Sequence, residues 1–192
     1  MEQPLHNQRP MDDLYNSDWI NTDGNFIHRT AIITDYVTLG TGNIIGAYAV
    51  IGSRGEMRAT DKFLGRVIIG DNNVISELVT IQRPAMEGFL TVIGSDNIIM
   101  AHTHIGHDAL VGDNCELCTG TIIGGYAQVG NNVKIKLGVT VRNRIVIEDG
   151  ACVGMGSVVV KDVFANQTVM GNPAKTKANP LDQIPLSCHP QS

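Results

Sequence analysis

Three histidines, His102, His104 and His107, lie within six residues of one another in the segment IMAHTHIGHDALVGDNCELCTGTIIGGYAQV (99–129). An imidazole with the ordinary pKa of about 6.5 can accept or release a proton at neutral pH, which suits it to general-base catalysis. Asp108 follows His107 directly and could orient the ring or stabilise the imidazolium ion. His107 is therefore the candidate base of a reaction centre.

The same segment belongs to a six-residue repeat that runs from Ile27 to Val159. Of the positions spaced six apart between these two residues, only Glu87 is not apolar. Six is not a helical period, but it fits a short strand plus a turn, with one large residue pointing inward per strand. The spacing predicts an all-β fold, a parallel β-helix of hexapeptide repeats.

Three hexads make one triangular coil of 18 residues, and successive coils stack about 4.8 Å apart. The repeat domain, 27–164, has room for about seven to eight coils, between an N-terminal cap (1–26) and a C-terminal tail (165–192). Two segments near 53–66 and 83–91 keep the phase but lose the apolar pattern. We expect them to form loops off the column, where ligand contacts usually lie.

Composition and charge narrow the function classes. No apolar run approaches the roughly 18 residues of a membrane span, and the polar start lacks a signal-peptide core, so we expect a cytoplasmic protein. Residues 1–129 hold seven basic against fifteen acidic side chains, whereas residues 130–178 hold seven against three. A nucleic-acid binder is more typically basic throughout, and we expect none here. The basic end suits a phosphorylated ligand, with ordinary solvated charge as the alternative.

The 18-residue stacking predicts what surrounds His107. Gly125 should lie one coil above it and Asn143 two coils above. The column beside them should contain Gly106, Gly124 and Arg142. This arrangement predicts a groove along one edge, with an imidazole on its floor, exposed backbone N–H groups in its middle and a cation at its far end.

Cys115 and Cys118 form a C-x-x-C pair. A zinc site needs a second ligand pair, and a thioredoxin-like motif needs a strand followed by a helix. Neither context is present in the sequence, and Cys115 falls on a small-residue position of the repeat. We interpret the pair as structural and predict no metal site.

The repeat, together with HTHIGHDALVGDN (102–114), resembles the hexapeptide-repeat acyltransferases, most of all the UDP-N-acetylglucosamine O-acyltransferases of lipid A and lipopolysaccharide synthesis. The resemblance covers roughly residues 27–172 and implies a left-handed winding. It also implies transfer of an acyl group from an acyl-CoA or acyl-carrier-protein thioester to a hydroxyl or amine of a nucleotide-linked sugar, with no tightly bound cofactor. Because a triangular coil offers flat repeated faces, we expect a homotrimer with active sites between subunits.

The resemblance also assigns residue roles. His107 corresponds to the catalytic base, Asp108 to its partner, and Gly125 to the backbone donor for the oxyanion. The expected substrate contacts are Asp61, Lys62, Gln82, His102 and His104. The stacking, and not the resemblance, places the expected acyl-donor contacts Gly106, Gly124, Tyr126, Arg142 and Asn143 along one edge. The segment GNPAK (171–175) resembles the CoA-contacting tail of acetyltransferases and adds Asn172 and Lys175.

The sequence departs from this family at three places. Tyr126 stands where the family has a histidine after the oxyanion glycine, and Arg142-Asn143 replaces a His-Gln pair. We expect residues 176–192 to be too few for the C-terminal helical domain that helps recognise acyl carrier protein. This favours a CoA donor or a different mode of carrier-protein recognition. Acyl length, donor, the particular sugar, O- or N-acylation and the role of the tail stay open.

Two alternatives remain from other classes of protein. A γ-type carbonic anhydrase also folds as a hexapeptide β-helix and binds zinc through histidines; Ile105-Gly106-His107 matches its motif, but Gly112 and Gln82 stand where further ligands are expected. A non-catalytic scaffold is the other alternative, and it predicts that His107 has no part in any acyl transfer.

Overall fold

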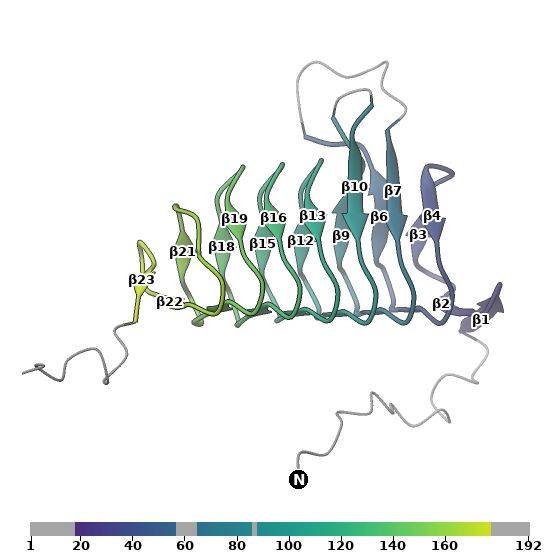
Figure 1. The fold of residues 1–192 in the computed structure, drawn as a ribbon. Helices are drawn as coiled ribbons and strands as arrows, with labels where there is room; N and C mark the ends of the chain where they lie inside the picture. Colours follow the sequence, from purple (N-terminus) through teal and green to yellow (C-terminus); the bar gives the residue numbers. More distant parts are fainter. Residues whose placement is uncertain (1–17, 57–64, 86–87, 178–192) are drawn as a thin grey trace, which may run out of the picture.

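The computed structural model of the chain describes residues 18–56, 65–85 and 88–177. These residues form strands and turns without a helix, wound into a left-handed parallel β-helix, as the repeat and the resemblance predicted (Figure 1). Within these ranges there is accordingly no helix long and apolar enough to cross a membrane. Residues 1–17 of the expected cap and 178–192 of the expected tail lie outside the described residues.

Three sheets form the sides of the triangle, and neighbouring strands of a sheet come from successive coils. In spatial order, sheet A contains β1 (Trp19–Thr22), β2 (Asn25–His28), β5 (Ile44–Ile45), β8 (Val74–Ile75), β11 (Ile98–Ile99), β14 (Glu116–Leu117), β17 (Lys134–Ile135), β20 (Cys152–Val153), β22 (Thr168–Met170) and β23 (Lys175–Thr176). Sheet B contains β3 (Ile32–Ile33), β6 (Val50–Ser53), β9 (Thr80–Gln82), β12 (His104–Ile105), β15 (Ile122–Ile123), β18 (Thr140–Val141) and β21 (Val158–Val159). Sheet C contains β4 (Val37–Leu39), β7 (Arg66–Ile69), β10 (Leu90–Ile93), β13 (Leu110–Val111), β16 (Gln128–Val129) and β19 (Val146–Ile147).

The apolar residue of each hexad points into the triangle and stacks on its counterpart in the next coil. In sheet A, this column includes Ile45, Ile75, Ile99, Leu117 and Ile135, all with 0% exposure. Burying one such side chain contributes about 1.5–3 kcal/mol. One coil alone has no neighbour to cover this face, so the coils stabilise one another.

The register between coils locates two insertions. In sheet B, Ile51 pairs with Ile81, 30 residues on, Ile81 with Ile105, 24 on, and Ile105 with Ile123, 18 on. Relative to 18, the first step contains twelve extra residues and the second contains six. Because both are multiples of six, the sequence repeat continues through segments that have left the column. The strands form seven coils from β2 to β21, the lower end of the expected range. The repeat positions 57, 63 and 87 lie outside the described residues.

A ladder of asparagines runs inside the column beside sheet A. Its members are Asn25, Asn43, Asn73 and Asn97, each buried. In each step, a side-chain oxygen accepts the backbone N–H of the next residue up, at 2.8 Å for Asn43, 2.9 Å for Asn73 and 3.0 Å for Asn97. The top oxygen, on Asn97, accepts the N–H of Cys115 at 2.7 Å. These polar side chains are tolerated in the core because their hydrogen-bonding groups are matched from coil to coil.

Antiparallel hairpins flank sheet A at both ends. Strand β1 pairs with β2, and Trp19 meets the ring of His28 edge-on at 5.2 Å. At the other end, β23 pairs with β22. Each hairpin supplies hydrogen bonds to a strand that would otherwise lie at the edge of the parallel sheet.

Replacing Asn73 with alanine is expected to destabilise the fold by about 2–4 kcal/mol, because the N–H of Asn97 and the carbonyl of Gly94 lose their side-chain partner. Urea denaturation followed by circular dichroism measures the change. Asn21→Ala, on the exposed face of β1, is the control and should stay within about 0.5 kcal/mol. Equal stability of the two variants would show that the ladder contributes nothing to stability.

Candidate active site

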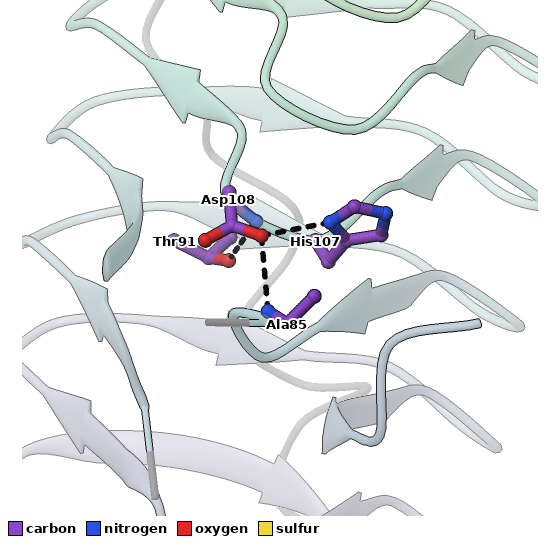
Figure 2. Close-up of polar contacts among 4 residues, drawn as sticks. All are labelled: Ala85, Thr91, His107 and Asp108. Atoms are coloured by element: carbon purple, nitrogen blue, oxygen red, sulfur yellow. Dashed lines mark hydrogen bonds and ion pairs between the residues drawn. The ribbon is translucent and has the colours of Figure 1, made fainter. Parts of the chain in front are cut away.

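His107 and Asp108 lie at the corner where β12 ends and β13 has not begun, between sheets B and C. Nδ1 of His107 lies 2.7 Å from Oδ2 of Asp108 (Figure 2). Consecutive side chains of an extended strand point to opposite faces. Here Asp108 has a left-handed backbone conformation, with φ of 59°, and this turn brings the two side chains together.

Asp108 makes two further hydrogen bonds, one through its carboxylate and one through its backbone, as Figure 2 shows. The backbone N–H of Ala85 donates to Oδ2 at 2.9 Å, and the backbone N–H of Asp108 donates to Oγ1 of Thr91, also at 2.9 Å. The Asp108 side chain has 0% exposure. When Nδ1 donates its proton to this carboxylate, Nε2 is the nitrogen left to accept one.

The inserted segments narrow the space around His107. A Cβ atom built on Gly55 would lie 2.9 Å from Cβ of His107, and the residue as a whole is only 9% exposed. The open groove expected from the stacking alone is therefore narrower on this side. The predicted groove took account of the regular coils alone, whereas Gly55 of the first insertion packs against His107.

Gly125 lies directly over the imidazole, as the 18-residue spacing predicted. A Cβ atom on Gly125 would lie 2.7 Å from Cε1 and 2.8 Å from Nε2 of His107, closer than real side chains approach. Its neighbour Tyr126 fixes this spacing, because the Tyr126 N–H donates to the carbonyl of His107 at 2.9 Å. The N–H of Gly125 itself has no hydrogen-bond partner among the described residues. Position 125 thus combines a requirement for glycine with a backbone donor beside Nε2.

His104 points outward from β12, next to the dyad. Its Nδ1 lies 2.7 Å from Oγ1 of Thr80 on the strand below. Burial lowers the pKa of His104; the Glu56 carboxylate raises this pKa, and His107 lowers it. The net lowering favours a neutral imidazole at neutral pH.

The other expected substrate contacts divide between two corners and an undescribed segment. Gln82 is buried at the end of β9, near the dyad's corner. His102 is exposed at the opposite end of β12, at the corner between sheets A and B, so the structure separates it from His107. Asp61 and Lys62 lie outside the described residues.

The residues expected along the donor edge lie in two places. Arg142 and Asn143 are exposed at the corner that holds His107, and Gly106, Gly124 and Arg142 follow one another at 18-residue steps. Lys175 lies instead in β23, on sheet A, where Met170 is its strand partner. The turn before it contains Asn172, which precedes a cis proline. The structure therefore does not bring the C-terminal pair to the corner of the dyad.

Tyr126 lies beside the imidazole rather than along the outer edge alone. Its ring meets that of His107 edge-to-face, with centroids 5.1 Å apart and planes at 89°. The guanidinium of Arg144 lies over the Tyr126 ring, 4.2 Å from the centroid. Burial and the Asp108 carboxylate raise the pKa of the Tyr126 hydroxyl, while Arg144 opposes this rise.

Sequence reasoning missed several of these neighbours. Thr91, Ala85 and Phe89 come from the second insertion and its return strand, where no repeat spacing places them against the dyad. Arg144 follows Tyr126 by 18 residues, so its position over the ring was available from the spacing. The prediction from the sequence instead assigned the cation at this corner to Arg142.

The two cysteines of the C-x-x-C pair make separate contacts. Cys115 is buried inside the column and its thiol donates to the carbonyl of Gly130 at 3.0 Å. Cys118 donates to Oε1 of Glu116 at 3.2 Å. Burial raises the pKa of each thiol to about 11, which disfavours the reactive thiolate. No three His, Cys, Asp or Glu side chains within the described ranges are grouped so as to hold a metal ion.

Residues 90–125, which include the dyad and Gly125, match the model of the bacterial transferase hexapeptide (six repeats) family. This match and the observed fold define a β-helix built from hexapeptide-transferase repeats, and they confirm the resemblance inferred from the sequence.

Three of the similar proteins are named for one activity. The chain is 40% identical over 114 residues to the acyl-[acyl-carrier-protein]–UDP-N-acetylglucosamine O-acyltransferase of Pseudomonas putida, over 59% of this chain and 44% of the relative. A UDP-N-acetylglucosamine acyltransferase structure from Bacteroides fragilis aligns with a TM-score of 0.78 and 28% identity, over 81% of this chain and 61% of that one. The UDP-N-acetylglucosamine O-acyltransferase structure from Moraxella catarrhalis aligns with a TM-score of 0.64 and 29% identity, over 81% of this chain and 73% of that one. The chain thus spans less than half the length of the curated relatives it matches.

We predict that the His104 imidazole titrates below the ordinary value of about 6.5, because burial lowers its pKa. Glu56→Gln should move the midpoint further down, since the Glu56 carboxylate raises this pKa. The unfolded chain then binds the proton first as the pH falls, so the free energy of unfolding decreases from pH 6.5 down to the folded midpoint.

NMR titration of the histidine ring signals, assigned with a His104→Gln variant, measures the midpoint. A midpoint at or above the ordinary value, or an upward move in Glu56→Gln, would contradict this electrostatic account.

Proposed function

We propose that the chain is an acyltransferase that moves an acyl group from a thioester to the sugar of a nucleotide sugar, with UDP-N-acetylglucosamine as the leading acceptor. The observation that carries the proposal is the meeting of three groups: Nε2 of His107, the buried Asp108 carboxylate on Nδ1, and the Gly125 N–H, which no described residue engages. A base and an oxyanion donor side by side are what acyl transfer from a thioester needs. The names of the relatives supply the substrate classes.

The reaction follows from this geometry in two steps. Nε2 of His107 removes the proton of the acceptor hydroxyl as its oxygen attacks the thioester carbonyl, and Asp108 stabilises the imidazolium ion. The Gly125 N–H donates a hydrogen bond to the oxyanion that forms. When the tetrahedral intermediate collapses, the C–S bond breaks and the thiolate takes the proton back from the imidazolium.

The acyl donor is a co-substrate, either acyl-CoA or acyl-carrier protein, and no tightly bound cofactor takes part. Both donors carry a phosphopantetheine arm. The next coil fills the positions that side chains would take at Gly106 and Gly124, so these glycines leave no room for the arm. We place the arm instead past the exposed Arg142 and Asn143 at the same corner, with the Arg142 guanidinium available to its phosphate. A cytoplasmic location stays the expectation from the sequence.

The active unit is a homotrimer. Sheet C presents an apolar groove of about 680 Å³, lined by Val92, Leu110 and Val146 among others, and Leu110 is 39% exposed. This face adjoins the corner that carries the dyad, so a second copy packed against it would close the site from outside.

Light scattering coupled to size-exclusion chromatography should therefore give three times the 20.7 kDa of one chain at micromolar concentration. Leu110→Asp, which places a charge in the groove, should shift the mass toward that of the monomer. Ile20→Asp on β1 is the control and should stay trimeric, because Ile20 is an apolar residue away from sheet C and is 50% exposed. A monomeric parent protein would rule out a site between subunits.

The function is tested by incubating the full chain with UDP-N-acetylglucosamine and acetyl-CoA, longer acyl-CoAs or acyl-carrier proteins in turn. Mass spectrometry should detect an acylated nucleotide sugar. His107→Ala should lower its formation by about 10²–10⁴, with the melting temperature unchanged. His28→Ala is the control, because His28 lies in β2, far from His107 in the sequence. This variant should match the parent in acyl transfer.

Full turnover by His107→Ala would remove this residue from the mechanism. Zinc-dependent hydration of carbon dioxide without acyl transfer would favour the carbonic anhydrase alternative. Absence of both activities and of ligand binding would favour a scaffold.

A further inference from the structure

Tyr126 occupies an unusual position relative to the dyad. It lies one coil above Asp108, and both residues have a left-handed backbone, with φ of 60° and 59°. Its backbone N–H is bonded to the carbonyl of His107, and its ring edge meets the imidazole at 5.1 Å. The same residue is therefore tied to His107 through both its backbone and its side chain.

The imidazole needs a second restraint besides Asp108. A ring held through one nitrogen can still turn about that hydrogen bond, and Nε2 would then swing away from the Gly125 N–H. Glycine at 125 offers no side chain to prevent this. An edge-to-face aromatic neighbour restricts the turn, because the perpendicular geometry is the favoured one.

Tyr126 is itself held on its other sides. The guanidinium of Arg144 lies over its face at 4.2 Å, and the ring of Phe89 meets it edge-to-face at 6.3 Å. Arg144 comes from the next coil and Phe89 from the residues just before β10. Two separate elements thus hold the ring that contacts His107.

We propose that Tyr126 is a positioning residue, whose ring keeps the His107 imidazole turned so that Nε2 faces the acceptor and the Gly125 N–H. The inference rests on the proposed function and deepens it. It assigns a role to the position where the acyltransferases that this chain resembles carry a histidine. We assign the role to the ring, because the ring makes the contacts with His107, Arg144 and Phe89, whereas the hydroxyl interacts with the Asp108 carboxylate.

Three variants separate ring from hydroxyl and side chain from backbone. Tyr126→Phe keeps the ring and removes the hydroxyl, which interacts with the Asp108 carboxylate. Tyr126→Leu removes the ring, and Arg144→Gln removes the cation over its face. Tyr48→Leu is the matched control, because Tyr48 also has a left-handed backbone, with φ of 58°, but is 61% exposed at a different corner. Any backbone cost of leucine in this conformation is then common to both leucine variants.

In the acyl-transfer assay, Tyr126→Phe and Tyr48→Leu should stay within about twofold of the parent, whereas Tyr126→Leu should lose about tenfold to a hundredfold in kcat. The KM values for both substrates should change little, because the ring acts on the base and not on binding. Arg144→Gln, which leaves the aromatic pair in place, should lose less than Tyr126→Leu.

A second readout does not depend on the reaction. With ¹⁵N-labelled histidine, the parent and Tyr126→Phe should show His107 mainly with the proton on Nδ1. In Tyr126→Leu, the two tautomers should mix and the ring signals broaden, with the melting temperature close to that of Tyr48→Leu.

The proposal is overturned if the His107 signals and kcat of Tyr126→Leu match those of the parent. It is also overturned if Tyr126→Phe loses as much as Tyr126→Leu, since the hydroxyl would then carry the effect. If the parent shows no acyl transfer at all, the proposed function fails, yet the NMR comparison still decides whether Tyr126 positions the imidazole. If Tyr126→Leu does not fold, the His107 ring signals of Arg144→Gln and Tyr126→Phe decide. Broader signals in Arg144→Gln together with unchanged signals in Tyr126→Phe support the proposal. Broader signals in Tyr126→Phe together with unchanged signals in Arg144→Gln contradict it.

Discussion

The stacking of coils through parallel backbone hydrogen bonds is the constraint on which the rest of this structure depends. Each bond, such as that from the Tyr126 N–H to the His107 carbonyl, fixes which residue lies over which. A single register error would move Gly125 off the imidazole and place a side chain there. The stacking register therefore builds the candidate site directly, because the proposed oxyanion donor, Gly125, and the proposed base, His107, lie in consecutive coils of the same column.

Two departures from the regular coil complete the site at one corner. The insertions after β6 and β9 bring Gly55 against His107 and the Ala85 N–H to the Asp108 carboxylate. Left-handed backbones such as those of Asp108, Tyr126 and Arg144 also occur at the other two corners, for example at Tyr48 and Asn132, and so belong to the regular winding of the coil. The hydrogen-bonded coils above and below can hold these conformations.

The sequence predicts the regular part of the fold because one large apolar residue recurs every six positions, and the 18-residue spacing places Gly125 over His107. The loss of the apolar pattern near 53–66 and 83–91 indicates the two insertions, but the phase does not reveal their lengths, since twelve and six extra residues preserve it. The asparagine ladder escapes a search for apolar positions, although Asn43, Asn73 and Asn97 occupy one place in the hexad. The contact of Asp108 with Ala85 depends on the path of a loop, which no periodicity encodes. Lys175 was expected along the donor edge because the pattern does not show that β23 turns back onto sheet A.

The proposed chemistry requires the backbone at Gly125 and Nε2 of His107 to act together on one thioester carbonyl. The most direct test is the single-turnover rate of acyl transfer by a Gly125→Ala variant with saturating substrates. A methyl group there would lie 2.7–2.8 Å from the imidazole and must displace it from the Gly125 N–H. We expect a rate lower by about a hundredfold or more, in a variant that folds and binds the nucleotide sugar as the parent does. A rate equal to that of the parent would contradict this joint action.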